Sequence, residues 1–541
     1  MSNSNVLRGT MMLTGANFLS KFLGIIYVIP FYLLVGDAGG ALYTYAYNPY
    51  QIFLSVATLG IPLAMSKFIA KYNALEEYAT KDAMLKTGLV LMLSMGTLAF
   101  LILFVSAQWL AQLIIPSNDL ANSVEDVTFV IRMVSFALII LPAMSLFRGY
   151  FQGHESMGPT AVSIVVEQII RIVFVLASAY LVIHVFKGTV TLAVGLATFA
   201  ALIGAIASSA VLLTYFKKRK PMIDREAHLK GYGTVTRTKK DMMSELFTYA
   251  GPFVLVGIAT PMYQMIDQFT FNRAMANIGL ADISEKLLSV ILLYGHKLVI
   301  IPVTIAIGLA MAVMPAITRS FTENNQAQYT SYIHQAFLIV MLLVLPASVG
   351  LAILSDQAYG SLYNVEEAIS YAGPLLAYYA PVALFFALFT VSASMLQGIN
   401  HQNYAVISLG VGLAVKLILN IPFIQMFEAK GAVFATGLAV LTAAALNILK
   451  IYRVTRFNVR PLYRKSLLIA ILTAVMAVVV LLVKWFVGLP FGEEATKWKM
   501  ITQLIFSVLI GAYAYLWMAY KTTLLERLLG DRVKRFSKWF I

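Results

Sequence analysis

The chain has 541 residues, of which 60% are hydrophobic and 12% are charged, and its formal net charge is +15. A soluble protein of ordinary composition carries about 25% charged residues, so these proportions predict a polytopic membrane protein. Cysteine is absent, which excludes disulfides, thiol catalysis and cysteine-ligated metals. We attribute the basic excess to the Lys and Arg of cytoplasmic loops, because no soluble basic domain suited to nucleic acid is present.

Fourteen segments are apolar and long enough to cross a bilayer, which takes roughly 20 residues per helix. The first segment contains Lys21 and has no cleavage site after a short apolar core, so we expect it to be retained and not removed as a signal peptide. The segments together predict an all-α polytopic membrane protein with 14 transmembrane helices. Their ranges are 7–35, 41–70, 83–107, 126–151, 159–184, 190–216, 244–269, 287–316, 330–354, 371–396, 403–427, 431–452, 466–487 and 500–520.

The loops between these segments differ in charge. Segment 217–240 holds nine Lys and Arg against two acids, and segment 453–465 holds five and no acid. Loops 108–125 and 355–370 contain neither Lys nor Arg. Since basic loops stay in the cytoplasm, the alternation predicts that both termini are cytoplasmic. The basic tail 521–541 is interpreted as a further cytoplasmic segment, with binding along anionic headgroups as the alternative.

Two stretches of the sequence resemble each other at a constant offset of 245 residues. YFQGHESMGPTAVSIVVEQIIRIVF at 150–174 aligns with MLQGINHQNYAVISLGVGLAVKLIL at 395–419, so that Ser163 matches Ser408 and Arg171 matches Lys416. A repeat with equal orientation in both copies predicts two pseudo-symmetric six-helix lobes in parallel, an architecture of transporters that bind substrate between lobes. The alternative is that short Gln-Gly turns recur by chance.

The repeat and the charge pattern together predict the organisation of the chain. We expect an N-terminal lobe, a basic cytoplasmic linker, a C-terminal lobe, two additional helices and a basic cytoplasmic tail. Their predicted ranges are 1–216, 217–243, 244–454, 455–520 and 521–541.

Four cations lie deep inside predicted spans, between ten and fourteen residues from the start of each. They are Lys21, Arg171, Lys297 and Lys416. A charge at the membrane centre costs roughly 2.5–3.5 kcal/mol on insertion scales, so each of them needs an ion-pair partner, water or a ligand. Two of the four, Arg171 and Lys416, occupy equivalent positions in the repeat, which favours a shared function.

Acids at comparable depth are fewer. Glu167 precedes Arg171 by four residues, the spacing of helical ion pairs, so we predict that these two residues pair. Asp267 is expected near the outer end of its span, and Arg148 is expected to be an interfacial anchor. Because these acids are too few to neutralise the cations, the sequence indicates a hydrated central cavity that accepts an anion such as a phosphate. The alternative is that each charge has a structural role.

His296 lies beside Lys297 and points roughly 100° away around the helix. We consider it either a gating residue or a hydrogen-bonded structural histidine. GxxxxGK[ST], GxSxG and HExxH patterns are absent and the six histidines are scattered, so we predict no enzyme, no metal site and no cofactor. A coupling ion, the membrane potential or a downstream pull would then drive transport.

Several stretches carry a resemblance to a known family: LRGTMMLTGANFLSKFLGIIYVIPF, GGALYTYAYNPYQIFLSVATLGIPLAMSKFIAKYN, VIRMVSFALIILPAMSLFRGYFQGHESMGPTAVSIVVEQIIRIVF and LFTVSASMLQGINHQNYAVISLGVGLAVKLILNIP. They are similar to MurJ-type lipid II flippases of the multidrug/oligosaccharidyl-lipid/polysaccharide exporter superfamily, a group related to the sporulation protein SpoVB. The resemblance covers nearly the whole chain and is weakest in the loops and the last two helices.

The resemblance assigns places to individual residues. SKFLG at 20–24 is similar to a Ser-Arg-x-Leu-Gly stretch of the family, which gives Lys21 the place of an arginine. YGHKL at 294–298 is similar to a Tyr-Ala-Asp-Arg-Leu stretch, which gives Lys297 the place of an arginine and His296 that of an acid. Further arginines of the family are missing at Tyr27 and in 48–56. We therefore expect Arg171, Lys297 and Lys416 to bind the pyrophosphate in their place.

The resemblance implies a flippase that moves undecaprenyl-pyrophosphoryl disaccharide-pentapeptide, lipid II, from the inner to the outer leaflet of the bacterial plasma membrane for peptidoglycan synthesis. It also implies alternating access of two lobes, with membrane lipids as partners and the isoprenoid tail in an apolar groove of the last two spans. One alternative is a flippase for another lipid-linked oligosaccharide of capsule, teichoic acid or spore cortex. Others are a multidrug/cation antiporter of the same superfamily, disfavoured by the basic interior, and a non-transport scaffold.

Overall fold

The computed structural model describes residues 3–58, 61–116, 120–229, 257–491 and 494–529, together with residues 238 and 241. Within these residues the chain forms helices and no strand. Eleven helices are long and apolar enough to cross a membrane, or up to twelve if the bent pair Met12–Ile26 and Val28–Thr58 makes one crossing. The prediction of an all-α polytopic membrane protein is thereby confirmed.

The chain divides into two compact units, Met1–Phe269 and Thr270–Ile541. Their boundary falls inside helix α10 (Ala259–Asn277) and not in the segment 217–243 that the charge pattern predicts as a linker. The first part of that segment continues helix α8 (Val190–Leu229), and most of the remainder lies outside the described residues.

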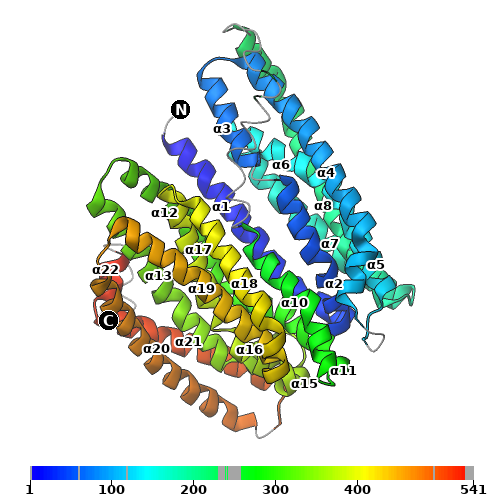
Figure 1. Ribbon diagram of the computed structural model, residues 1–541, viewed down its shortest axis with the longest axis vertical. Helices are drawn as coiled ribbons and strands as arrows, with labels where there is room; N and C mark the ends of the chain where they lie inside the picture. The colour runs from blue at the N-terminus through cyan, green and yellow to red at the C-terminus, as the bar shows by residue number, and fades with distance from the viewer. Residues whose placement is uncertain are drawn as a thin grey trace. The chain divides into compact units, whose positions relative to one another are not determined.

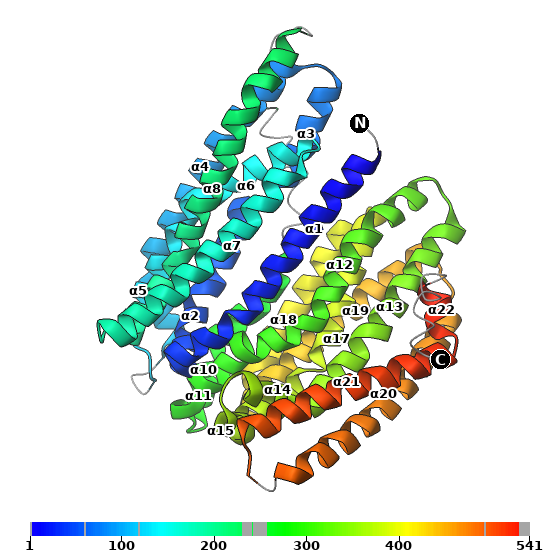
Figure 2. The ribbon, with the colours of Figure 1, turned by 180° about the vertical axis from the view of Figure 1, so that it is seen from behind.

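The first unit is a bundle in which long helices lie alongside one another (Figure 1). Helix α7 packs against α8 and also against α1, and α6 packs against both α3 and α4. Figure 2 shows α1 running along α7. Besides α8 and the start of α10, the helices are α1 (Asn3–Ile26), α2 (Val28–Thr58), α3 (Ile61–Ala74), α4 (Tyr78–Ile114), α5 (Val124–Ser135), α6 (Ala137–Gly153), α7 (Met157–Tyr180) and the π-helical turn η1 (Leu181–Val185).

The chain changes direction twice near the beginning of the first unit. The axes of α1 and α2 differ by 42° across Tyr27. Gly36 then breaks α2, with a φ of 65° that is accessible to glycine at little cost. This break coincides with the gap between the predicted spans 7–35 and 41–70. The helix therefore bends at Tyr27 and is interrupted at Gly36. Hydropathy alone does not distinguish these two changes of direction.

The second unit contains the end of α10 and the remaining helices. Helix α18 packs against α19, α12 against α17, and α20 against both α21 and α13. The elements are α11 (Ala281–Ser289), η2 (Val290–Tyr294), α12 (Gly295–Thr322), α13 (Gln326–Ile353), α14 (Ser355–Leu362), α15 (Val365–Glu367), η3 (Ala368–Ala372), α16 (Gly373–Tyr379), α17 (Val382–Gly398), α18 (Gln402–Phe427), α19 (Ala429–Thr455), α20 (Val459–Gly488), η4 (Leu489–Phe491), α21 (Lys497–Lys521) and α22 (Leu524–Leu529).

Helix pairs in the two units repeat the offset seen in the sequence. Helices α17 and α18 start 245 residues after α6 and α7. The turn between the helices of each pair contains a non-glycine residue with positive φ, Glu155 at 55° and Asn400 at 60°. The preceding helix ends in each case on a glycine in close contact with another backbone, Gly153 with Ser66 and Gly398 with Met314. The repeated sequence therefore forms the same local structure twice.

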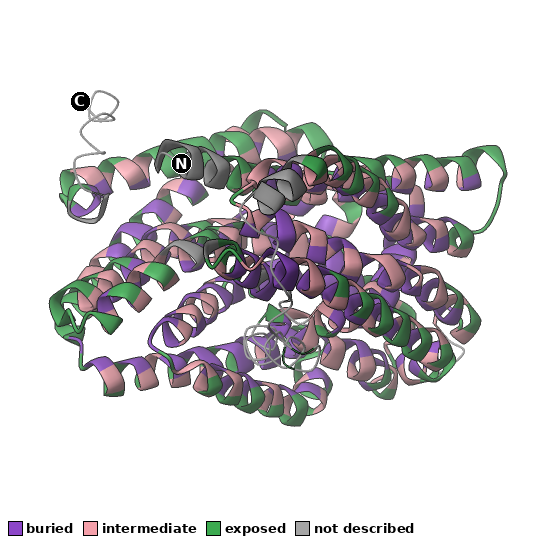
Figure 3. Ribbon diagram, turned by 90° about the horizontal axis from the view of Figure 1, so that it is seen from above, coloured by how far each residue is buried: buried purple, intermediate pink, exposed green. Residues whose placement is uncertain are grey.

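Apolar side chains cover the outer sides of the long helices. Buried residues lie where helices of a unit pack together, and exposed residues lie on the outside (Figure 3). On α20 the exposed apolar side chains include Leu467, Ile471, Val475, Leu482 and Trp485. In a helix whose backbone groups are satisfied internally, such a surface is suited to contact with lipid.

Candidate functional site

Arg171 in the middle of α7 is held by a glutamine one turn earlier. Its Nη2 donates a hydrogen bond to Gln168 Oε1 at 2.6 Å. Arg171 itself is half-buried, whereas Gln168 is only 4% exposed. A Cβ atom placed on Gly24 of α1 would lie 3.3 Å from Gln168 Nε2, so the absence of a side chain there leaves room for the amide. Gln168 is a functional candidate that the sequence analysis missed. It could have been found as a polar side chain three residues before Arg171 in a predicted span.

Glu167 pairs with a different arginine from the one predicted. Glu167 Oε2 lies 2.7 Å from Arg148 Nη2, and Arg148 also donates to Ser163 Oγ at 3.0 Å and to Ser208 Oγ at 2.9 Å. The Arg148 side chain is 18% exposed. The predicted Glu167–Arg171 pair is therefore wrong, and Arg148 lies in a polar network among α6, α7 and α8. Helix spacing identifies neighbours on one helix, but here a residue on an adjacent helix is the partner.

A row of tyrosines lies close to Arg171. Tyr27, Tyr43 and Tyr47 lie near its guanidinium, as does the carboxylate of Glu167. The Tyr27 and Tyr43 hydroxyls are 3.3 Å apart, and the ring of Tyr47 stacks on Tyr43 with centroids 5.2 Å apart. Tyr47 also contacts Tyr50, at 5.4 Å between centroids. Phenol hydroxyls can donate hydrogen bonds to oxyanions, so this cluster can supplement the cation.

The other two predicted residues of the first unit differ in burial. Asp267 of α10 is 2% exposed. Its neighbour Gln268 accepts a hydrogen bond from Asn48 Nδ2 at 3.1 Å and donates to the Tyr45 carbonyl at 2.8 Å, which ties α10 to α2. Lys21 of α1 is exposed. Lys21 is thus exposed as a residue, whereas Asp267 lies in the interior.

Lys297 in the second unit follows a π-helical turn. Such turns occur frequently at functional sites, and η2 ends one residue before α12 begins at Gly295. A Cβ atom at Gly295 would come within 2.6 Å of the Val290 carbonyl oxygen, so this tight turn requires glycine. Lys297 and His296 are both half-buried. His296 Nδ1 is hydrogen-bonded to the Tyr379 hydroxyl at 2.7 Å, and the two rings stack, which orients the imidazole.

Lys416 of α18 is completely buried, with 0% of its surface exposed. Its Nζ donates to the Ala432 carbonyl oxygen at 2.9 Å and to Thr436 Oγ1 at 2.6 Å, both on α19. These bonds join α18 to α19 inside the second unit. In the described arrangement the ammonium is inaccessible to a ligand, in contrast to Arg171 at the equivalent repeat position.

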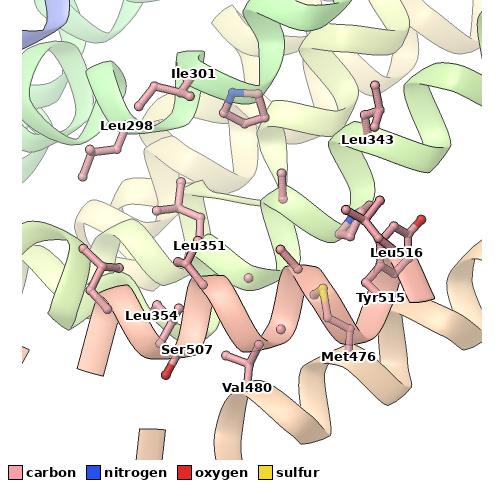
Figure 4. Close-up of a pocket in the computed structure, with 18 of the residues that line it drawn as sticks. Leu298, Ile301, Leu343, Leu351, Leu354, Met476, Val480, Ser507, Tyr515 and Leu516 are labelled. Carbon is pink, nitrogen blue, oxygen red and sulfur yellow. The ribbon is translucent and has the colours of Figure 1, made fainter. Parts of the chain in front are cut away.

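An apolar cleft lies between α12, α13, α20 and α21 in the second unit (Figure 4). Its volume is about 390 Å³. Side chains that project into it include Leu298, Leu351, Met476, Val480 and Leu516. Leu298 directly follows Lys297 in the sequence, so the helix that carries one candidate cation also forms a wall of the cleft. The cleft therefore has the apolar lining expected of a site for a hydrocarbon chain.

The chain is similar to known proteins along nearly its whole length. The family described as polysaccharide biosynthesis protein matches residues 6–321, and the MatE family matches residues 252–422. The lipid II flippase MurJ of Bacillus subtilis (strain 168) is 41% identical over 539 residues, which are 99% of each chain. Stage V sporulation protein B of the same organism is 22% identical over 82% of each chain.

Solved structures share the fold. A structure of the lipid II flippase MurJ in an inward closed conformation has a TM-score of 0.69 at 14% sequence identity, over 96% of this chain and 99% of that chain. An inward-facing multidrug resistance transporter of the MATE family has a TM-score of 0.59 at 14% identity, over 82% of this chain and 99% of that chain. The fold is therefore common to both transporter groups and does not by itself select a substrate.

Proposed function

This chain belongs to the polysaccharide biosynthesis protein family and, within it, to the lipid II flippases, and from that premise we propose that it moves lipid II from the inner to the outer leaflet of the bacterial plasma membrane. The substrate would be a glycan joined through pyrophosphate to undecaprenol. Transport of this kind breaks no covalent bond, so the protein acts as a transporter and not as an enzyme. The flipped lipid would supply peptidoglycan synthesis.

The arrangement around Arg171 is the observation that carries this proposal. Arg171, a half-buried residue, lies in the middle of a membrane helix, and buried Gln168 holds the position of its guanidinium. The acid one turn earlier, Glu167, pairs with Arg148 instead. A guanidinium arranged in this way retains donors for the oxygens of a pyrophosphate, to which arginine can bind bidentately. The nearby tyrosine hydroxyls would add neutral donors.

The other candidate residues have different roles in the proposal. Lys21 and Lys297 would contribute positive charge to the substrate cavity, Lys297 from the start of α12. His296 and Asp267 would support or gate the cavity, and Glu167 would support it by fixing Arg148. Lys416 would reach a substrate only after releasing Ala432 and Thr436, so we assign it a holding role between α18 and α19 in this conformation.

We further infer the transmembrane organisation that such transport needs. The chain would cross the membrane fourteen times, as two six-helix repeats and two additional helices, with both termini in the cytoplasm. Movement of one repeat relative to the other would expose the central cations to each side in turn. Replacement of water by cationic side chains would lower the cost of carrying a pyrophosphate through a medium of low dielectric constant.

The isoprenoid tail would remain in an apolar environment during this movement. The cleft between α12, α13, α20 and α21 has walls of leucine, methionine and valine, and burial of each methylene group contributes about 0.8 kcal/mol. Since Leu298 of its wall follows Lys297, a tail in the cleft would start close to a candidate headgroup cation. The membrane potential or an ion gradient would drive the cycle.

Complementation in cells depleted of their own lipid II flippase tests the proposal. We expect the wild-type chain to restore growth and to restore lipid II accessibility at the outer leaflet. Lys297→Ala should reach the membrane in equal amount and fail to restore accessibility. Lys430→Ala is the matched control, because Lys430 is also a lysine of the second unit but is exposed at the start of α19.

Two outcomes would contradict the proposal. Restored growth without lipid II at the outer leaflet would indicate another lipid-linked oligosaccharide as the substrate. Full activity of a variant with Lys21, Arg171, Lys297 and Lys416 all changed to alanine would remove the site assignment.

A further inference from the structure

A second cavity in the second unit has a polar lining. It lies at the start of α13, whereas Lys297 lies at the start of α12. Its volume is about 370 Å³, and it is formed by the first four turns of α13 and the first two turns of α20. The proposed function makes no use of this cavity. The residues that line it are Ala327, Thr330, Ser331, His334, Gln335, Leu338, Pro461 and Lys465.

The lining of this cavity offers hydrogen-bond donors and a positive charge. Lys465 is its charged residue, and no carboxylate is among the lining side chains. The Ser331 hydroxyl and the Gln335 amide add neutral donors. His334 uses Nε2 in a 2.7 Å hydrogen bond with the Asn458 carbonyl oxygen, and its ring packs edge-on against Phe457. This donor set is suited to a ligand that carries acceptor oxygens and negative charge.

The surroundings place the cavity where a lipid headgroup would lie. Segment 453–465, which leads into α20, contains five Lys and Arg and no acid. Both α13 and α20 are membrane-spanning helices, and the cavity is at the beginning of each. Leu338, one of the lining residues, is 2% exposed and belongs to the apolar cluster between α13, α20 and α21. The lining thus combines polar and basic side chains with a leucine that is continuous with the apolar core.

We propose that this cavity binds the phosphate group of an anionic phospholipid, with Lys465 as the charged ligand and Ser331 and Gln335 as neutral ligands. Two sources share this chemistry, the phosphodiester of a lipid headgroup and free phosphate, and the position of the cavity at the start of two long apolar helices favours the lipid. Occupancy would attach the start of α20 to α13 and so anchor the pair α20 and α21, which both line the apolar cleft. The site is independent of the substrate cations.

Native mass spectrometry of the purified full chain tests the site. The protein is equilibrated with equal amounts of phosphatidylglycerol and phosphatidylcholine, and the bound lipids are counted. We expect the wild type to retain phosphatidylglycerol in preference, and Lys465→Gln to lower that preference about fivefold, the factor that one Lys near an anionic surface contributes. Lys465→Arg should keep the preference because the charge is retained.

Arg460→Gln is the matched control. Arg460 belongs to the same basic segment and its change removes the same charge, but it is exposed and does not line the cavity. An unchanged lipid preference in Arg460→Gln, with equal unfolding temperatures of all variants in phosphatidylcholine, would support the site. An equal decrease in Arg460→Gln and Lys465→Gln would overturn it, because general attraction by the basic segment would then suffice.

A competition experiment with inorganic phosphate distinguishes a lipid headgroup from free phosphate as the ligand. If excess inorganic phosphate displaces phosphatidylglycerol from the wild type and raises its unfolding temperature in the absence of lipid, and Lys465→Gln removes both effects, then the site binds free phosphate. If phosphate has no such effect while the lipid preference depends on Lys465, the headgroup is the ligand. Loss of neither kind of binding in Lys465→Gln would refute the proposal.

Discussion

Arg171 and Lys416 occupy equivalent positions in the two repeats but have different surroundings. The α6–α7 and α17–α18 pairs are offset by 245 residues, as are these two cations. Arg171 is half-buried and bonds to a glutamine of its own helix. Lys416 is fully buried and bonds to the neighbouring α19. Equal depth along equivalent helices therefore does not produce equal access to a ligand.

The polar networks around the matched serines differ in the same way. Ser163 accepts a hydrogen bond from Arg148, whose other partners are Glu167 and Ser208. Ser408, its repeat equivalent, donates to Asn447 at 2.5 Å in a network of neutral side chains. The first unit thus keeps an ion pair where the second keeps amides and hydroxyls. A charged network costs more to bury than a neutral one, which favours a functional reason for it in the first unit.

The largest difference should appear when each cation is replaced by methionine. We expect Arg171→Met to lower lipid II flipping about 10–100-fold, because hydrogen bonds to charged groups contribute about 1.5–3 kcal/mol and 1.4 kcal/mol corresponds to about a factor of ten. Lys416→Met should fold and keep most activity, since an apolar residue of similar volume can replace a buried charge. Outer-leaflet lipid II in depleted cells is the measurement. Equal losses would show that Lys416 leaves α19 during transport.

A double-mutant cycle should identify the partner of Glu167. Glu167→Gln should lower the free energy of unfolding by about 1–3 kcal/mol, less than for a fully buried pair because both side chains keep some exposure. The effect should largely vanish when Arg148→Met is already present, whereas Arg171→Met should leave it intact. Thermal unfolding in detergent measures all variants. A larger coupling between Glu167 and Arg171 would contradict the described pairing.

Gln168 should matter only in the first unit. We expect Gln168→Leu to lower flipping about fivefold, because one hydrogen bond that orients the guanidinium is lost at a net value of about 1 kcal/mol. Leu413 is the residue at the same offset in the second unit, and Leu413→Ala is the matched control, expected to leave flipping unchanged. Transport by Gln168→Leu at the wild-type rate would show that Arg171 does not need this support.

The smallest effect should follow from loss of the hydroxyl that holds Lys416. Thr436→Val removes one acceptor from the buried ammonium while the Ala432 carbonyl oxygen remains. We expect the free energy of unfolding to fall by about 1 kcal/mol, with flipping unchanged. Unfolding in detergent and the flipping assay together check this result. A decrease in flipping without a loss of stability would indicate that Lys416 contacts substrate.

Local pattern was sufficient for much of the fold. Eleven predicted spans correspond to the eleven long apolar helices, because hydrophobic length is a property of contiguous residues. The helix bounds around the Gln-Gly turns also follow the repeat in the sequence. The bend at Tyr27 was not predicted, since it depends on φ and ψ at a single residue within an apolar stretch, and the break at Gly36 was predicted only as a gap between two spans.

The sequence by itself determined an all-helical membrane protein, its internal repeat and the four cations inside its spans, because apolar length, residue spacing and charge can be read from consecutive residues. Only the tertiary structure decided that Glu167 pairs with Arg148, that Gln168 holds Arg171 and that Lys416 is buried against α19. Two of these three contacts join different helices, and even the third depends on the space that Gly24 of α1 leaves. Which helix lies beside a charged side chain is set by packing, and that neighbour determines whether the charge is bound or accessible.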